Sequence, residues 1–184
     1  EPRGRVRFLS EDERKRLLEA CKCSKNRHLY LIVMLALSTG MRSGEILNLK
    51  WSDIDLENGT IVLHQTKNNE RRRIPLTGLV LDLLRKRKEE KTLSLLLFPG
   101  KKKNVPVDIR SAWETAIKKA EILLYTFHCN RHGFASNLLA KGASIAQLAE
   151  VLGHKTLQMV KRYSHLSEGA ARDIVGKMTE ELFG

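Results

Sequence analysis

Two arginines of this sequence lie beside acidic or imidazole side chains in a way that suits phosphate binding. Arg42, in the stretch TGMRSGEILNLKW, follows Gly40, and Glu45 lies three residues further on, near enough to hold its guanidinium group. Arg131, in HCNRHGFAS, lies three residues after His128, so the two are neighbours on one helical turn. A planar guanidinium group binds phosphate oxygens in a bidentate way. These residues could therefore support phosphoryl transfer without a metal ion.

A third stretch, LGHKTLQMVKRYSHL, supplies a candidate nucleophile, Tyr163, with His154 nine residues before it. A free phenol is a weak nucleophile with a pKa of about 10, but positive charge clustered around its oxygen favours the phenolate. Covalent attack would keep the bond energy in a phosphotyrosine, so a strand could be rejoined without ATP. Nine residues of continuous helix would set the two side chains on opposite sides. We therefore expect the chain to turn at Gly153 and Thr156.

Other chemistries receive little support from the sequence. No GxxxxGK[ST] or GxGxxG loop is present, which argues against nucleotide-driven chemistry. Three carboxylates in WSDIDLENG could be drawn as metal ligands, but that segment is rich in turn formers and reads better as a solvated loop. His128, Cys129, His132 and His154 lack the spacing of a zinc site. We expect neither a metal nor a cofactor.

The charge of the chain indicates a polyanionic partner. Its 184 residues include 33 Lys and Arg against 21 Asp and Glu, a net charge of +12 with a pI near 9.8. Any one basic cluster is most simply solvated surface, but phosphate backbone binding explains the large total better. The longest apolar run, Leu29–Leu37, is too short to span a membrane, and the charged N-terminus does not resemble a secretory signal. We expect a cytoplasmic protein with a polyanionic partner.

The elements that must position these residues are mostly helical. Capping boxes at Ser10 with Glu13 and at Ser144 with Gln147 predict two helix starts. Helices are expected from Ser10 and over about 26–38, 42–49, 78–90, 108–121, 130–141 and 144–152. The segments 60–64 and 73–76 predict a β-hairpin with its turn near Asn68. The fold class is α+β, mainly α, with one small antiparallel β-sheet.

Taken together, the patterns TG.R..E..L.W.DID, H..RH.FAS, and LGH followed nine residues later by Tyr and SHL closely resemble the tyrosine recombinase (phage integrase) family. The resemblance runs from about Arg7 to about Leu166 and corresponds to the helical catalytic domain of that family. It implies that residues 1–184 form a single catalytic domain, with residues 1–9 resembling a linker. The family's N-terminal core-binding domain has no counterpart in this sequence.

The resemblance also implies a role for each matched residue. The six active-site positions are Arg42, Lys67, His128, Arg131, His154 and Tyr163. Tyr163 would attack the scissile phosphate and leave a 3′-phosphotyrosyl link and a free 5′-hydroxyl, and Lys67 would protonate that leaving oxygen. The two arginines would clamp the nonbridging oxygens. His128 would assist proton transfer and hydrogen-bond the phosphate, and His154 would donate to the same phosphate. Glu45 and His132 would support these groups.

Double-stranded DNA is the partner that the resemblance implies, with a homo-tetramer in the synaptic complex and a monomer as an isolated domain. Surface cations expected to bind the DNA backbone are Arg71, Arg72, Lys101, Lys102 and Lys103. A type IB topoisomerase-like nicking-closing enzyme and a noncatalytic basic DNA-binding protein are the alternatives. The tail 167–184 has Ile174, Met178 and Leu182 on one helical stripe, which would pack on its own domain or be exchanged between protomers.

Three positions depart from the family pattern. Cys129 and Asn130 stand where the family usually has an acidic residue followed by Leu, so a polar side chain occupies a normally apolar position. Gly133 is also unusual, and it should weaken the start of its helix by about 1 kcal/mol relative to Ala. We expect the polar Asn130 to affect local packing more than chemistry.

Overall fold

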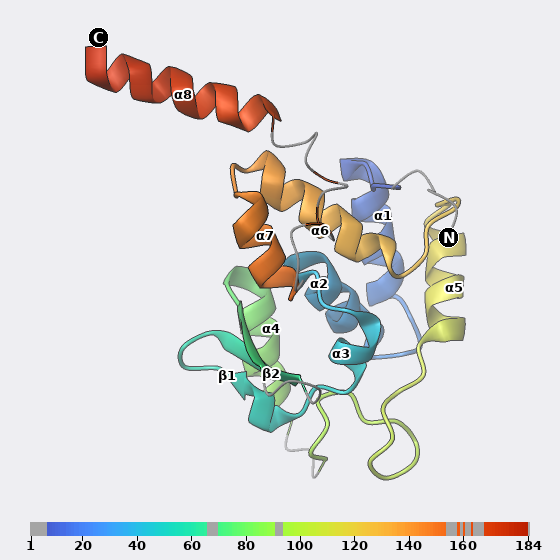
Figure 1. Cartoon of the computed structure of the whole chain (residues 1–184). Helices are drawn as coiled ribbons and strands as arrows, with labels where there is room; N and C mark the ends of the chain where they lie inside the picture. Colours follow the sequence, from blue (N-terminus) through green and yellow to red (C-terminus); the bar gives the residue numbers. More distant parts are fainter. Residues whose placement is uncertain are drawn as a thin grey trace. The chain divides into compact units, whose positions relative to one another are not determined.

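The structure is a computed structural model that describes residues 7–65, 70–90, 94–153 and 168–183 and the single positions 158, 160 and 163. The chain divides into two compact units, Glu1–Gly133 and Phe134–Gly184, which are described separately below. Helices and a small sheet make up the first unit, and the second is helical where it is described (Figure 1). The mainly helical α+β fold with one small antiparallel sheet is as the sequence predicts.

The helices begin and end close to the expected positions. Those of the described part are α1 (Glu11–Lys22), α2 (Leu29–Thr39), α3 (Ser43–Leu47), α4 (Gly78–Glu89), α5 (Arg110–Lys119), α6 (Cys129–Ala140), α7 (Ile145–Leu152) and α8 (Glu168–Phe183). A 3₁₀ turn, η1 (Trp51–Asp53), precedes the sheet. None of the helices among the described residues is long and apolar enough to cross a membrane.

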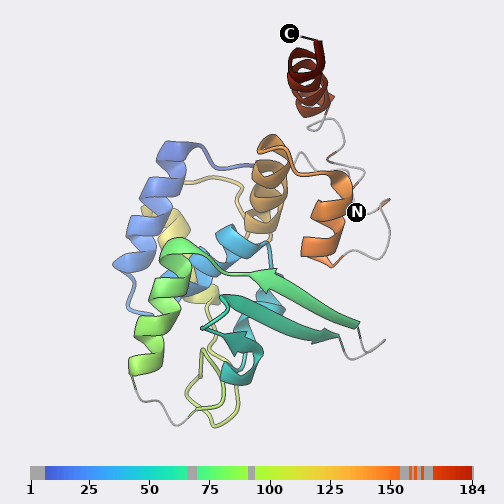
Figure 2. The ribbon, with the colours of Figure 1, turned by 90° about the vertical axis from the view of Figure 1, so that its left-hand side faces the viewer.

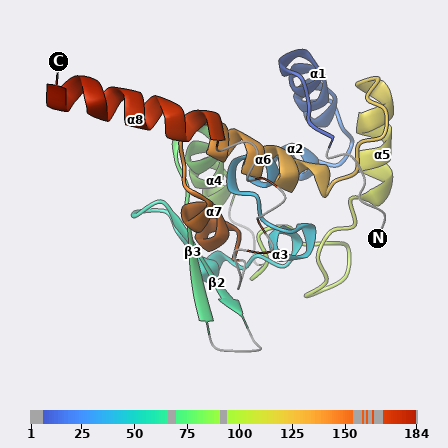
Figure 3. The ribbon, with the colours of Figure 1, turned by 45° about the horizontal axis from the view of Figure 1, so that its top comes forward.

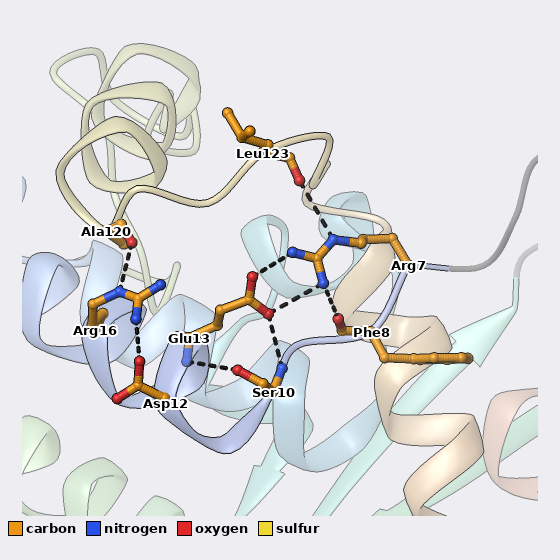
Figure 4. Close-up of polar contacts among 8 residues, drawn as sticks. All are labelled: Arg7, Phe8, Ser10, Asp12, Glu13, Arg16, Ala120 and Leu123. Atoms are coloured by element: carbon orange, nitrogen blue, oxygen red, sulfur yellow. Dashed lines mark hydrogen bonds and ion pairs between the residues drawn. The ribbon is translucent and has the colours of Figure 1, made fainter.

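The start of α1 is fixed by a network of polar contacts (Figure 4). The Ser10 hydroxyl accepts a hydrogen bond from the Glu13 backbone N–H at 3.1 Å, and the Glu13 carboxylate accepts one from the Ser10 N–H, which confirms the predicted capping box. Arg7 pairs with the same carboxylate, and this contact, with the Ser10 N–H, lowers the pKa of Glu13 to about 2. Arg7 also donates to the Leu123 carbonyl oxygen, so the segment before α1 is tied to the loop after α5.

The core of the first unit is built around α2, as its nearly continuous apolar sequence predicts. Seven of its eleven residues are buried, on all sides of the helix, because α1, α3 and α4 pack around it. The helix ends at Gly40, whose φ of 62° lies in the left-handed region that glycine adopts without a steric penalty. The predicted end of this helix is therefore confirmed, and Arg42 follows directly after it.

The sheet has the strand order β1–β2–β3 and is antiparallel throughout (Figure 2). Strands β2 (Thr60–Gln65) and β3 (Glu70–Pro75) form the predicted hairpin, and β3 begins three residues earlier than expected. Strand β1 (Ile54–Asp55) was not expected, because two residues are too few to show an alternating pattern. The predicted turn near Asn68 lies outside the described residues.

The second unit has a small core of its own. The predicted capping box at the start of α7 is present, with the Ser144 hydroxyl accepting from the Gln147 N–H at 3.1 Å. Helix α7 ends at Gly153, which is left-handed as expected. The buried residues of this core are Ala135, Leu139, Leu148, Ala149, Leu152, Val160 and Tyr163.

Helix α8 carries its apolar side chains on the outside. Val175, Met178 and Leu182 retain between 50 and 63% of their surface exposed, and Phe183 is more exposed still. The predicted helix is confirmed over Glu168–Phe183, but the side chain of Ile174 lies outside the part that the structure describes.

A buried histidine links three elements of the first unit. His28, which precedes α2, is 7% exposed, and its Nδ1 lies 3.2 Å from a guanidinium nitrogen of Arg87 on α4. Its ring meets Phe98 edge to face. Burial, helped by the nearby Arg87 and Arg27 cations and opposed by Glu90, lowers the pKa of His28 to about 4. The ring is therefore neutral and accepts a hydrogen bond from Arg87.

This arrangement predicts a loss of stability in mild acid. Because the folded-state pKa lies below the ordinary value of about 6.5, the unfolded chain binds a proton that the folded chain does not, between about pH 6.5 and 4. The contribution of His28 is present above pH 6.5 and falls by about 2 kcal/mol between pH 7 and pH 5. Urea unfolding at pH 7 and pH 5 measures this change. The free energy of unfolding of His28→Gln should fall less between the two pH values than that of the wild-type chain. An equal loss in both proteins would contradict the assignment.

Candidate active site

The geometry around Arg42 confirms that Glu45 holds it. Arg42 is the residue before α3, and its backbone N–H donates to Glu45 Oε2 at 2.8 Å while its Nη1 donates to Oε1 at 3.1 Å. Both contacts span three residues, so the short helix α3 is what brings the carboxylate back to the arginine. The Arg42 side chain remains 43% exposed. One part of the guanidinium group is fixed while the side chain still faces solvent.

A second arginine reaches Glu45 from the sheet, and it was not foreseen. Arg72 on β3 donates through Nη2 to Glu45 Oε2 at 2.8 Å (Figure 3 shows α3 and the β2–β3 hairpin). Burial alone would raise the pKa of Glu45, but the Arg72 cation, the Arg42 N–H and the Arg42 cation together hold it below its ordinary value. Glu45 is therefore a carboxylate that two arginines share.

Arg131 is fixed at the end of α2. It lies in the first turn of α6, is 4% exposed, and donates through Nη1 to the carbonyl oxygen of Gly40 at 2.7 Å. A cation is favoured at this place because the last carbonyl groups of a helix carry partial negative charge. Gly40 precedes Arg42 by two residues, so the two predicted phosphate-binding arginines converge on the same helix end.

The two histidines of the HCNRHG motif lie beside each other at the start of α6. The rings of His128 and His132 are 4.8 Å apart between centroids and nearly perpendicular. His128 is exposed and His132 is half-buried. The Arg131 N–H donates to the His128 carbonyl oxygen at 3.1 Å, so the motif forms one compact turn. A solvent-facing imidazole therefore stands next to the buried arginine in sequence and in space.

The polar residue Asn130 is accommodated without loss of hydrogen bonding. It is fully buried, and its Oδ1 accepts from the Tyr125 hydroxyl at 2.9 Å while its Nδ2 donates to the Phe127 carbonyl oxygen at 2.9 Å. A buried amide whose oxygen and nitrogen both have partners costs little. The expected disturbance of packing does not appear at this position, because Asn130 pins the loop that leads into α6.

The predicted nucleophile lies in the second unit. Tyr163 is 3% exposed and packs in the core that α6 and α7 form there, and Val160, three residues earlier, is buried in the same core. The end of α7 at Gly153 breaks the helix before His154, as the spacing requires. His154 and Lys67 themselves lie outside the described residues.

The cations expected to bind the DNA backbone differ in exposure. Arg71 is exposed on β3, whereas Arg72 is buried against Glu45 and does not stand on the surface. Lys101, Lys102 and Lys103 are exposed in the loop before α5. The first two of these line an open groove of about 1430 Å³, which is also lined by Lys25, Arg27 and Arg110. The lysine run therefore belongs to a wider basic surface.

Comparison with known proteins gives one consistent result. The model of the phage integrase family matches residues 7–169. The shufflon-specific DNA recombinase of Escherichia coli is 35% identical over 164 residues, covering 89% of this chain and 41% of that protein. The tyrosine recombinase XerA of Saccharolobus solfataricus is also 35% identical, covering 89% and 54%. The chain thus spans about half the length of these relatives.

Solved structures agree in fold. The catalytic domain of bacteriophage HP1 integrase is 31% identical with a TM-score of 0.73, and the match covers 94% of this chain and 95% of that one. The XerA recombinase is 31% identical with a TM-score of 0.74, covering 96% and 66%. A third, the XerH recombinase bound to its difH substrate, is 26% identical with a TM-score of 0.70, covering 91% and 52%. The described fold is that of tyrosine recombinase catalytic domains.

The geometry of α6 predicts opposite effects for two glycine substitutions. A Cβ at Gly133, inside the helix, would meet no heavy atom within 4 Å, so Gly133→Ala should raise the free energy of unfolding by about 0.5–1 kcal/mol. Gly142, just after the helix, has equal space but a φ of 93°. Gly142→Ala should therefore lower stability by at least about 1 kcal/mol. Urea unfolding measures both, and a destabilised Gly133→Ala would show that this position needs glycine.

Proposed function

Because this chain belongs to the phage integrase family, we propose that it is the catalytic part of a site-specific DNA recombinase that cuts and rejoins duplex DNA. One observation carries the proposal: Arg42 and Arg131, from segments far apart in sequence, converge on the end of α2. Each is fixed by a separate acceptor, Glu45 or the Gly40 carbonyl oxygen, as transition-state stabilisation by preorganised cations requires. A protein that only binds DNA would need no such fixed pair.

In the proposed reaction, the Tyr163 hydroxyl gives up its proton with the assistance of His128. Its oxygen attacks the scissile phosphorus, and the bond from phosphorus to the 5′-oxygen breaks. The leaving oxygen takes a proton from Lys67, which gives a 5′-hydroxyl and a 3′-phosphotyrosyl link. Arg42 and Arg131 bind the nonbridging oxygens, where charge changes most in the transition state. His128 and His154 donate to the same phosphate. Rejoining is the reverse attack by a 5′-hydroxyl, so neither ATP nor a metal ion is consumed.

The burial of Tyr163 adds a condition to this reaction. Its side chain is 3% exposed and packs with the other buried residues of the second unit's core. Cleavage therefore requires the Tyr163 phenol to become accessible to the scissile phosphate. Once accessible, the hydroxyl would be activated by the positive charge at the phosphate site.

The partner in this proposal is duplex DNA, held by the basic surface. The exposed Arg71 and the lysine run Lys101–Lys103 carry charge without a role in the chemical step, which suits contacts with the phosphate backbone. A homo-tetramer would assemble in the synaptic complex. The exposed apolar side chains of Met178 and Leu182 on α8 support exchange of this helix between protomers, because they offer a surface that a neighbour could cover.

Tyr163→Phe should abolish strand cleavage and spare DNA binding. The measurement is a nicked suicide duplex, carrying a site identified by sequencing DNA trapped on the protein in cells, followed by gel detection of the covalent complex. The wild-type chain should form this complex in the presence of EDTA, because the proposed step uses no metal. The phenylalanine ring keeps the packing but lacks the nucleophilic oxygen.

Other outcomes of that experiment point elsewhere. Unchanged cleavage by Tyr163→Phe would eliminate the tyrosine mechanism. Tight binding by the wild-type chain without any covalent product would favour a noncatalytic DNA-binding protein. Relaxation of supercoiled plasmids that lack the site would favour the nicking-closing alternative.

Arg131→Lys should slow cleavage far more than it weakens binding. Lysine keeps the charge but loses the planar fork that reaches both the Gly40 carbonyl oxygen and a phosphate. We expect the single-turnover rate to fall about 100-fold or more, and the DNA dissociation constant to rise only a few-fold because one contact among many is altered. Single-turnover cleavage and a binding titration measure the two quantities. An equal loss in both would reduce Arg131 to a binding contact.

A further inference from the structure

Arg72 occupies a position where an arginine is costly unless it serves a specific contact. On β3 the side chains alternate, so Arg71 and Arg73 are exposed, whereas Arg72 shares the inner face with the buried Ile74. Only 5% of the Arg72 side chain is exposed. A buried guanidinium group loses its hydration and must be compensated by hydrogen bonds and an opposite charge. Glu45 supplies that compensation at 2.8 Å.

The contacts of Glu45 are divided between the two arginines. Oε2 accepts from Arg72 and from the backbone N–H of Arg42, each at 2.8 Å, while Oε1 accepts from the Arg42 guanidinium group at 3.1 Å. With Oε2 occupied, a single carboxylate oxygen is left for the Arg42 side chain. Arg42 is therefore held at one nitrogen in place of the bidentate pairing that a carboxylate would otherwise offer.

Exposure rises in order along these three residues. The side chains of Arg72, Glu45 and Arg42 are 5%, 22% and 43% exposed. The chain of contacts thus runs from the interior beneath the sheet to the surface where a phosphate could approach.

We infer that Arg72 is a positioning residue for Arg42, acting through the shared carboxylate of Glu45. This inference rests on the proposed function, since Arg42 has a phosphate to bind only if the chain cleaves DNA. Arg72 orients Glu45, and Glu45 in turn fixes the direction in which Arg42 leaves the end of α2. Because Arg72 belongs to β3, the same ion pair also ties the β2–β3 hairpin to α3.

Removal of Arg72 should misdirect Arg42 without removing it. In Arg72→Gln the carboxylate loses its strongest partner, and Oε2 becomes available to the Arg42 guanidinium group. Arg42 would then turn toward Glu45 and away from the phosphate. We expect the single-turnover cleavage rate at saturating DNA to fall about 10- to 100-fold, with a less than three-fold change in the DNA dissociation constant.

Two further variants make the test specific. Arg72→Lys keeps the charge at Glu45 and should recover part of the rate, although an ammonium group cannot reproduce the guanidinium geometry. Arg73→Gln is the matched control. Arg73 is the exposed neighbour on the same strand, and its replacement removes the same positive charge as Arg72→Gln. It should leave the cleavage rate at saturating DNA within about two-fold of wild type.

A double-mutant cycle identifies the route of the effect. If Arg72 acts through Glu45, adding Arg72→Gln to Glu45→Gln should cost little further cleavage rate, whereas the same change in the wild-type chain costs about ten-fold or more. Thermal unfolding of each variant checks that it is folded at the assay temperature. If Arg72→Gln is not folded, Arg72→Lys replaces it in the cycle. The effect of Arg72→Lys on the cleavage rate is then compared between the wild-type chain and Glu45→Gln, which tests the same coupling.

The results separate this inference from the proposed function. Absence of covalent product from the wild-type chain would overturn the proposed function itself. If the wild-type chain is active and Arg72→Gln cleaves at the same rate, only the positioning role is overturned. Equal losses in binding and cleavage would make Arg72 a DNA contact, and a full additional loss in the Glu45→Gln background would show that it does not act through Glu45. Either result overturns the inference.

Discussion

The hydrogen bond from Arg131 to the carbonyl oxygen of Gly40 joins the two segments on which the proposed chemistry depends. It exists because α2 ends in a left-handed glycine, which exposes helix-end carbonyl groups and turns the chain outward just before Arg42. The buried apolar helix α2 fixes that end within the core, and α6 begins with Arg131 directed at it. One helix terminus thereby sets the place of both cations, and Glu45 then sets the direction of one of them.

Much of this arrangement could be predicted because its signals are local. The capping box at Ser10, the apolar run of α2 and the glycine that ends it depend on residues within a few positions of one another, and each was found where expected. The contact between Arg42 and Glu45 is also local, spanning three residues. The family resemblance added a predicted role that no local signal indicates, that of Lys67.

The remaining features depend on contacts between distant segments. The pairing of Arg72 with Glu45 crosses from the sheet to α3, although the alternation that buries Ile74 could have marked Arg72 as the one inward arginine of three. Asn130 is a different case: its partner, the hydroxyl of Tyr125, lies only five residues earlier, but in the loop before α6, where no sequence pattern indicates the pairing. His28 gave no sequence signal, since its burial requires Arg87 from a helix that comes much later.

The shared carboxylate also affects how natural variation in such chains should be read. Arg72 pairs with Glu45 in the interior, so losing Glu45 alone would remove a carboxylate partner of a buried cation, and losing Arg72 alone would change how Glu45 pairs with Arg42. Positions 45 and 72 should therefore covary: a change at one is tolerated when the other changes with it. The exposed neighbours at positions 71 and 73 lie under no such restraint. Three adjacent arginines that look alike in the sequence are thus expected to tolerate substitution to different degrees.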